Sequence, residues 1–279
     1  MQLKTLNGDV AKAVGRGEGQ ARALSDLLVR DTPVAYAFIA PAFFLLLFLV
    51  AYPFVLSVWL SLSDARVGET GAFVGLENFQ RLLTSSIFLQ TLQNSIIFTA
   101  AALGAKTVFG MALALLLFRI GRFKRLIRGA VLLPFIVPTA LSTLVWWWMF
   151  EPLYSVVNWT AIHAGLINPP GPNWLGMANY AMAAVIAVNV WRGLPFFAII
   201  VLAGLVSIPR EYYEAAEVDG ANSWGRFCHV TLPLLKPVLA VVILFSTIFT
   251  FSDFNIVQVL TSGGPVNTTH LFATLAYQV

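Results

Sequence analysis

The sequence contains little charge. Charged residues make up 11% of its 279 residues, whereas 58% are hydrophobic. Ordinary soluble domains contain about 25% charged and about 45–50% apolar residues. This composition excludes a soluble enzyme and a disordered chain, and it indicates a membrane protein. The net charge of +4 does not indicate a nucleic-acid partner, because Lys and Arg cluster beside long apolar runs.

Cysteine and histidine are also scarce. The one cysteine, Cys228, excludes a disulfide framework and any metal site built from several cysteines. The three histidines are scattered, and His163 and His270 are expected to be exposed in outer loops. We therefore expect no metal site and no catalytic residues.

Two kinds of segment are missing from the sequence. No Gly-x-x-x-x-Gly-Lys-Ser/Thr phosphate loop occurs, so the chain cannot itself cradle ATP. Residues 1–31 mix acids and bases without an apolar core, so they do not resemble a cleavable signal peptide. We expect these residues to form a polar cytoplasmic tail, followed by a transmembrane domain over residues 32–279.

Long apolar runs fill the rest of the chain. A transmembrane helix needs about 20 apolar residues, and the runs predict an all-α, polytopic bundle of about six spans. The predicted spans are approximately residues 33–63, 87–118, 129–150, 179–205, 237–259 and 269–279. The last run is too short to cross a bilayer, so we expect the sixth span to be incomplete in this chain.

The distribution of Lys and Arg predicts the orientation. Cytoplasmic loops carry an excess of these residues. Thirteen of the 17 fall in the tail and the even-numbered loops, two in the opposite loops and two within spans. The chain is therefore predicted to be a multi-pass membrane protein with a cytoplasmic N-terminus.

One predicted cytoplasmic loop, residues 207–236, is acidic rather than basic at its start. Ser207 is a candidate N-cap, Pro209 suits a first helical turn and Gly220 suits a left-handed terminator, which predicts a short helix between them. Its acids recur every third residue, so like charges share one side of this helix. A solvated acidic face explains Glu211 well and Glu217 poorly. We therefore favour a docking site for a basic partner protein.

This loop resembles a known motif. Glu214-Ala215-Ala216, then Asp219-Gly220-Ala221 and Leu232-Pro233-Leu234, resembles the EAA loop of permease subunits of bacterial ABC importers. Residues 260–265 (Leu-Thr-Ser-Gly-Gly-Pro), 133–135 (Leu-Pro-Phe) and 75–79 (Gly-Leu-Glu-Asn-Phe) resemble the carbohydrate-uptake subfamily.

The resemblance implies a transport subunit of a bacterial inner membrane rather than an enzyme. Its implied partners are a second homologous permease, two cytoplasmic ATPase subunits and an external solute-binding protein. The chain would hold no cofactor, because ATP and Mg would bind to the ATPase. The residues implied in ATPase coupling are Arg210, Glu211, Glu214, Ala215, Ala216, Asp219, Gly220, Leu232 and Pro233.

Polar residues within spans predict a solute path, since they are costly in lipid and usually face a cavity or a partner. The resemblance implies a sugar site built from Phe135, Thr139, Asn189, Gly193, Phe196, Thr250 and Asp253. Arg192 could recognise an anionic solute, but an intramembrane Arg more often pairs with a carboxylate such as Asp253 or extends its charge towards the membrane surface. We favour pairing or extension to the surface over solute contact, and the choice between pairing with Asp253 and contacting the solute stays open.

Two other functions stay open. The chain could be an ABC permease for a non-sugar solute, or an ion-coupled secondary transporter in which Lys106, Arg192 and Asp253 form a relay. The second leaves the acidic loop unexplained. An intramembrane enzyme is disfavoured, because Asp253 is the only acid within a predicted span.

Overall fold

The computed structural model describes residues 31–65 and 71–278. These residues form helices and connecting turns, with one isolated bridge between Ser63 and Phe73. The prediction of an all-α membrane bundle is thus confirmed. The chain divides into two units, residues 1–82 and 83–279. Most of the predicted tail, residues 1–30, lies outside the described residues.

The first unit contains one long apolar stretch. It consists of α2 (Asp31–Leu46), the π-helical turn η1 (Leu47–Ala51) and α3 (Tyr52–Ser61). The apolar segment Ala35–Ser61 has 27 residues, enough to cross a bilayer. The π-helical turn lies just before Pro53, which cannot donate a backbone hydrogen bond to the preceding turn. The first predicted span is confirmed.

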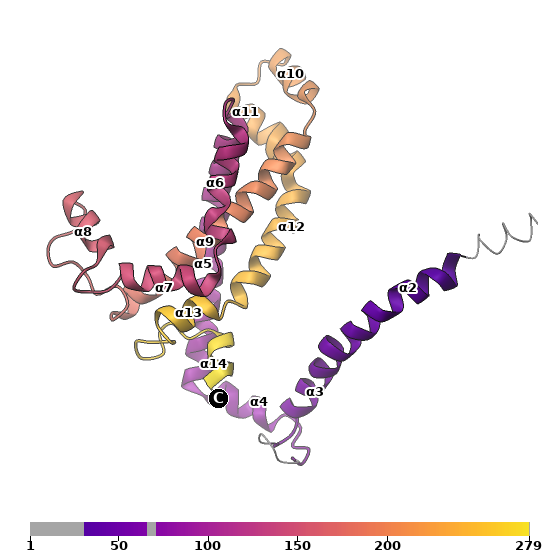
Figure 1. The fold of residues 1–279 in the computed structure, drawn as a ribbon, viewed down its shortest axis with the longest axis vertical. Coiled ribbons are helices and arrows are strands. Elements are labelled where there is room, and N and C mark those ends of the chain that lie inside the picture. Colours follow the sequence, from indigo (N-terminus) through magenta and orange to yellow (C-terminus); the bar gives the residue numbers. More distant parts are fainter. Residues whose placement is uncertain (1–30, 66–70, 279) are drawn as a thin grey trace, which may run out of the picture. The chain divides into compact units, whose positions relative to one another are not determined.

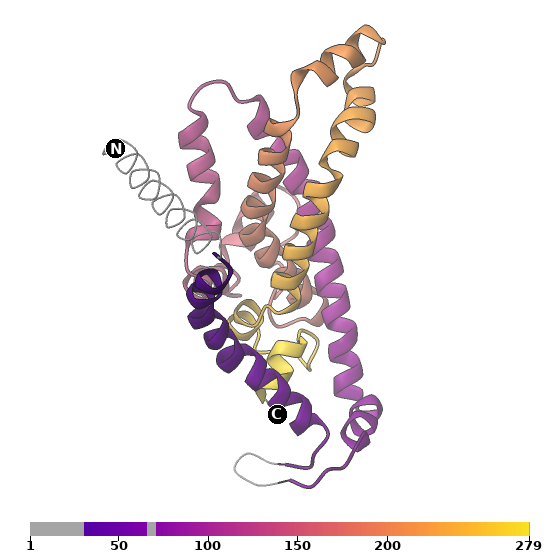
Figure 2. The same cartoon turned by 90° about the vertical axis from the view of Figure 1, so that its right-hand side faces the viewer.

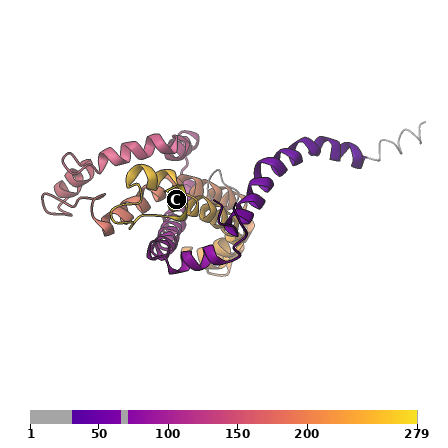
Figure 3. The ribbon, with the colours of Figure 1, turned by 90° about the horizontal axis from the view of Figure 1, so that it is seen from below.

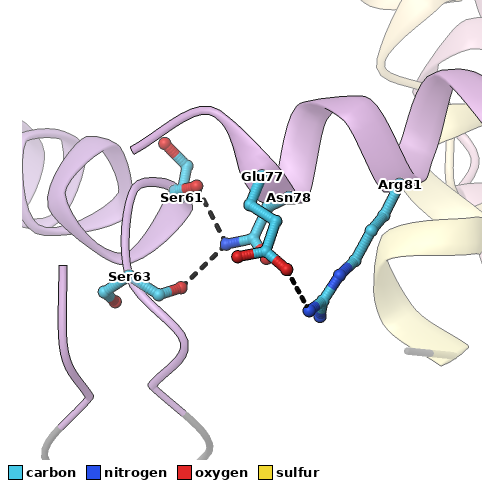
Figure 4. A network of polar contacts seen from close by, with 5 residues as sticks. All are labelled: Ser61, Ser63, Glu77, Asn78 and Arg81. Carbon is cyan, nitrogen blue, oxygen red and sulfur yellow. Dashed lines mark hydrogen bonds and ion pairs between the residues drawn. The ribbon is translucent and has the colours of Figure 1, made fainter. Parts of the chain in front are cut away.

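A side-chain contact joins the end of α3 to the start of α4 (Glu77–Thr84). The amide Nδ2 of Asn78 donates to the carbonyl oxygens of Ser61, at 3.1 Å, and Ser63, at 2.7 Å. Beside it, Arg81 forms an ion pair with Glu77 one turn earlier on α4 (Figure 4). Asn78 thereby satisfies carbonyls that the end of α3 leaves without helical partners.

The second unit is organised around two long helices, α5 (Ser86–Arg119) and α9 (Ala178–Ser207). They pack side by side along much of their length (Figures 1 and 2). Gly110 of α5 faces the buried ring of Phe197 on α9, where a Cβ at Gly110 would lie 2.6 Å from the ring. The missing side chain therefore permits the close approach of the two helices. Their bounds confirm the second and fourth predicted spans.

The third predicted span is broken. It is divided into α6 (Lys124–Ile136) and α7 (Thr139–Met149), which meet at 85°. Pro138 lies at the break and has no backbone N–H to continue the helical hydrogen bonds. The single span predicted from Gly129 to Phe150 is therefore wrong in its geometry.

The fifth span begins earlier than predicted. A nearly continuous helical segment consists of α11 (Ser223–Arg226), the π-helical turn η2 (Phe227–Thr231), α12 (Leu232–Phe251) and α13 (Asn255–Leu260). Pro237, the predicted start, lies within α12. The N-cap is Asn222, whose side chain accepts a hydrogen bond from the Gly225 amide at 2.8 Å.

Short helices complete the second unit. They are α8 (Val156–His163), α10 (Arg210–Val218) and α14 (Phe272–Gln278). Seen from below, the two yellow helices α13 and α14 lie together (Figure 3), and α13 packs against α9 while α14 packs against α5. Asn94 ties the loop before α14 to α5, because its amide donates to the carbonyls of Asn267 and His270 at 2.9 and 3.2 Å.

Four described helices are long and apolar enough to cross a membrane, and the bent pair α6–α7 can count as a fifth. The total of about six spans stays a prediction. Two buried apolar clusters hold the second unit together, one around Phe98 and Val188 and one around Phe197 and Leu235. A polar cavity lies among the same helices.

Candidate functional site: a polar cavity among the spans

A cavity of about 280 Å³ lies among α5, α6, α7, α9 and α12. All seven residues that sequence reasoning assigned to the solute lie around it. Its lining comprises Lys106, Phe135, Thr139, Asn189, Arg192, Gly193, Phe196, Ser246, Phe249, Thr250, Ser252, Asp253, Phe254 and Asn255. Residues from four predicted spans thus converge on one space.

Aromatic rings form one wall of the cavity. Phe135, at the end of α6, stacks on Phe196 of α9 with ring centroids 5.1 Å apart. Phe196 in turn meets the edge of Phe249 on α12 at 6.0 Å. The break after α6 places Phe135 here and starts α7 at Thr139, so both residues face the same space. Such a wall suits the apolar face of a ring-shaped ligand.

A buried lysine, which the sequence placed only in the ion-coupled alternative, also lines the cavity. Lys106 of α5 is 3% exposed, and its Nζ donates to Oγ1 of the fully buried Thr250 at 2.8 Å. Gly193 makes room for it, because a Cβ there would lie 2.7 Å from the Lys106 Cε. Gly193 therefore contributes space for the lysine rather than a polar group of its own.

The expected pairing of Arg192 with Asp253 is absent. The ion pairs found in residues 31–65 and 71–278 are Arg81–Glu77 and Arg226–Glu217. Asn189 reaches the carboxylate instead, donating from Nδ2 to Oδ2 of Asp253 at 2.8 Å. The Arg192 guanidinium carbon lies 5.7 Å from the Phe135 ring centroid, a cation–π contact.

Two polar atoms at the cavity are buried without a partner among the described residues. They are Oδ1 of Asn189 and Nε of Arg192. Buried polar atoms are usually hydrogen-bonded, so an unsatisfied acceptor and donor beside a cavity mark positions where a ligand or water can bind. One is an acceptor and the other a donor, which fits a ligand with hydroxyl groups.

Sequence reasoning missed Ser246 and did not use Phe249 or Phe254. Ser246 lies one helical turn before Thr250 on α12, so both project from the same face. A polar residue four positions before a site residue within an apolar run was the signal available for it. The two phenylalanines carry no such signal, because Phe249 is one of many apolar residues in α12 and Phe254, the N-cap of α13, is apolar like most of the residues around it.

The acidic loop forms α10 at the other end of the second unit from α13 and α14 (Figures 1 and 2). The predicted cap is wrong. Ser207 is the last residue of α9 and its hydroxyl donates to the Gly204 carbonyl at 2.8 Å, while Pro209 is the N-cap of α10 without a side-chain bond. The fixed φ of Pro209 suits this change of direction between two helices.

The predicted terminator is confirmed. Gly220 has φ +80°, and the amide of Ala221 donates to the carbonyl of Ala216 at 2.8 Å. This pattern ends a helix with a left-handed residue, for which glycine has no steric penalty. Leu232 and Pro233 lie apart from α10, at the start of α12.

Acidic side chains of α10 project into the surroundings. Glu211, Glu214, Ala215 and Asp219 are exposed, as is Arg210, and Ala216 is half-buried. Glu217 forms an ion pair with Arg226 of α11, so a contact within the loop explains this acid. Glu214 has no ion-pair partner within the described part of the chain.

The described residues contain no group of three or more His, Cys, Asp or Glu that could hold a metal. One expectation about the histidines is wrong. His270 is 3% exposed, and its Nδ1 lies 3.2 Å from the Thr274 hydroxyl oxygen. Burial lowers the pKa of His270.

Apolar helices of membrane-spanning length around a polar cavity define a multi-pass membrane transport protein. The chain belongs to the family described as the inner membrane component of binding-protein-dependent transport systems, whose model matches residues 106–279. The resemblance inferred from the acidic loop is thereby confirmed.

Named relatives cover most of the chain. The trehalose/maltose transport system permease protein MalF of Thermococcus litoralis is 35% identical over 91% of this chain and 85% of that protein. The sulfoquinovosyl glycerol transport system permease protein SmoG of Agrobacterium fabrum is 34% identical, over 89% and 80%. The trehalose transport system permease protein SugA of Mycobacterium tuberculosis is 32% identical, over 88% and 77%.

A solved structure shares the fold. It is a chain of a bacterial ABC transporter involved in the import of the acidic polysaccharide alginate, with a TM-score of 0.75 and 22% identity. The match covers 91% of this chain and 86% of that chain. This likeness confirms the architecture of an ABC importer permease.

Proposed function

We propose that the chain is the permease subunit of an ATP-driven importer that passes a carbohydrate through the polar cavity. The observation that carries this proposal is the convergence of an aromatic wall with amide, hydroxyl and carboxylate groups on one space. A sugar offers hydroxyls to such polar groups and an apolar ring face to phenylalanine. The names of the relatives, which specify trehalose, maltose and sulfoquinovosyl glycerol, support the same class of solute.

Asn189 is the residue through which this proposal is tested most directly. Its Oδ1 is free to accept a sugar hydroxyl, while its Nδ2 holds Asp253. Removing a partner of a buried hydroxyl costs about 1–3 kcal/mol, which corresponds to about 5- to 150-fold in the affected step. Asn179→Ala is the matched control, because Asn179 is exposed at the start of the same helix.

The experiment is ATP-dependent uptake of a panel of labelled sugars by the complete importer in proteoliposomes. Asn189→Ala should reduce uptake while Asn179→Ala should not, and both complexes should assemble. Uptake that needs no ATP would favour the ion-coupled alternative. If Asn189→Ala, Phe196→Ala and Asp253→Ala all transport at the normal rate in assembled complexes, the cavity is not the sugar path.

For energy coupling, we propose that α10 docks on a cytoplasmic ATPase subunit, with Glu214 contacting a basic residue there. The exposure of Glu214 and the lack of an ion-pair partner for it in the described residues support this role. A charge-assisted contact of this kind is strong and directional. ATP, together with Mg, would then be held by the partner chain, and binding and hydrolysis of the ATP would shift the permease between two states.

Charge reversal tests the coupling role. Glu214→Lys should lower ATPase co-purification or substrate-stimulated hydrolysis, while the permease still inserts in membranes. Glu77→Lys is the control, because Glu77 is an exposed acid whose ion pair on α4 contributes little. Wild-type hydrolysis and co-purification in Glu214→Lys would refute the assignment.

The remaining partners and the orientation belong to the same proposal. We expect a second, related permease, two ATPase subunits and an external binding protein, with the N-terminus and Gly220 inside and Gly171 outside. The distribution of Lys and Arg supports this orientation. After replacement of Cys228, a cysteine at 171 should react with an impermeant label from outside only. If the cysteine at 171 reacts from the cytoplasmic side only, the predicted orientation of the chain is wrong.

A further inference from the structure

The charged groups around the cavity do not balance. Among its lining residues, Lys106 and Arg192 are cationic and Asp253 is the single carboxylate. Two positive charges therefore face one negative charge in a region of low dielectric, where an uncompensated charge is costly. This is the cavity in which a sugar was proposed to bind. An inference that the missing negative charge comes from the solute therefore rests on the proposed function.

The one carboxylate is already occupied by neutral donors. Its Oδ2 accepts from Asn189 at 2.8 Å, and its Oδ1 accepts from the backbone amide of Ile256 at 3.2 Å. Neither cation forms an ion pair with Asp253 in the described part of the chain. Asp253 thus connects α9 to the first turn of α13, and this one carboxylate has to serve both cations without a direct ion pair to either in the described residues.

Both cations keep donors available. Lys106 has three N–H donors, and Thr250 accepts one of them. Arg192 has a buried Nε without a partner among the described residues, and its guanidinium lies over the Phe135 ring that walls the cavity. Lys106 is 3% exposed, so this lysine is not held in solvent. Gly193 leaves the space through which its side chain reaches the cavity.

We propose that the transported carbohydrate carries one anionic group, which Lys106 and Arg192 bind inside the membrane. One negative charge makes the cavity neutral, and the unused donors of both side chains supply charge-assisted hydrogen bonds to its oxygens. The aromatic wall and the free Oδ1 of Asn189 remain for the sugar ring and its hydroxyls. A uronic acid represents this class of solute.

The test compares neutral sugars with their acidic twins. The probes are radiolabelled maltose and trehalose, each alongside its derivative oxidised to a carboxylate at one C6 position. Binding is measured on the complete importer in nanodiscs without the external binding protein, so that selection by that protein does not contribute. The native complex should bind an acidic probe at least about 30-fold more tightly than its neutral twin, since breaking a buried charge pair costs about 2 kcal/mol or more.

Variants assign the preference to the two cations. Lys106→Met keeps the length of the side chain without its charge and should reduce the preference at least about tenfold, mainly by weakening binding of the acid. Arg192→Met should act in the same direction, and it provides a second measurement if Lys106→Met does not assemble. Lys124→Met is the control, because Lys124 is exposed at the start of α6, away from the cavity.

Each outcome has a defined meaning. Equal or tighter binding of the neutral sugars by the native complex overturns the anionic group and leaves the proposed sugar path standing. A preference that persists in both variants also overturns it. If both variants fail to assemble with the second permease, and the native complex binds acidic and neutral probes equally, the counter-ion of Lys106 and Arg192 comes from the second permease and not from the solute. If no probe binds, the sugar site and the inference that rests on it both fail.

Discussion

The contact between Gly110 of α5 and Phe197 of α9 predicts the effect of one methyl group. In Gly110→Ala, the new Cβ would lie 2.6 Å from Cδ1 and 3.1 Å from Cγ of the Phe197 ring. The ring is fully buried in an apolar cluster, so it cannot turn away into open space. Overpacking of this kind costs about 1–3 kcal/mol. The two longest helices of the second unit should therefore separate or pack under strain.

Gly104→Ala is a matched control on the same helix, because a Cβ at Gly104 meets nothing within 4 Å. Both variants gain the same helix propensity, so the difference between them isolates the packing cost. Thermal unfolding of the purified chain in detergent should place Gly110→Ala about 2–12 °C below Gly104→Ala, from about 2–4 °C per kcal/mol for a chain of this size. Equal melting temperatures would refute the close approach of α5 and α9.

Three other contacts predict the effects of a substitution or of pH. Gly193→Ala should force the ammonium of Lys106 away from Thr250 and reduce sugar uptake about tenfold or more, because a hydrogen bond to a charged group is worth about 1.5–3 kcal/mol. Unchanged uptake would contradict the contact between Gly193 and Lys106. Asn78→Ala removes both side-chain hydrogen bonds that join α3 to α4, so proteolysis of the connecting loop in intact spheroplasts should accelerate. An unchanged cleavage rate would show that these hydrogen bonds do not hold α3 and α4 together. Burial lowers the pKa of His270 below its usual 6.5, so the unfolded chain binds a proton at a higher pH than the folded chain does, and the stability present above about pH 6.5 should be lost as the pH falls. Melting temperatures measured down to about pH 5 should therefore decline less in His270→Gln than in the native chain. Equal declines would exclude His270 as the cause.

The apolar spans could be predicted from the sequence because bilayer thickness fixes the length of a crossing helix. Their breaks could be located less well. Pro134 and Pro138 are both visible in the third span, yet α6 continues through Pro134 and ends just before Pro138. Proline removes a hydrogen bond in either position, so neighbouring packing decides which one interrupts the helix.

The candidate site was predictable to the extent that polar residues within apolar spans are costly. That reasoning singles out Asn189 and Asp253 without knowledge of the fold. It could not predict which side chains would pair. Lys106 contacts Thr250 across 144 positions of sequence, and Asn189 takes the carboxylate expected for Arg192. Such pairings depend on how the spans pack against one another, and the hydropathy of each span alone carries no information about that packing.

The angle between α6 and α7 has a mechanical consequence. Because Pro138 has no N–H, rotation about the junction need not break a helical hydrogen bond at that residue. The 13 residues of α6 form a rod about 20 Å long, at about 1.5 Å per residue. A tilt of about ten degrees at the junction would displace its distant end, at Lys124, by about 3 Å while Phe135 beside the pivot hardly moves. The helix can thus act as a lever that turns a small rearrangement beside the cavity into a larger one at its distant end, near Lys124.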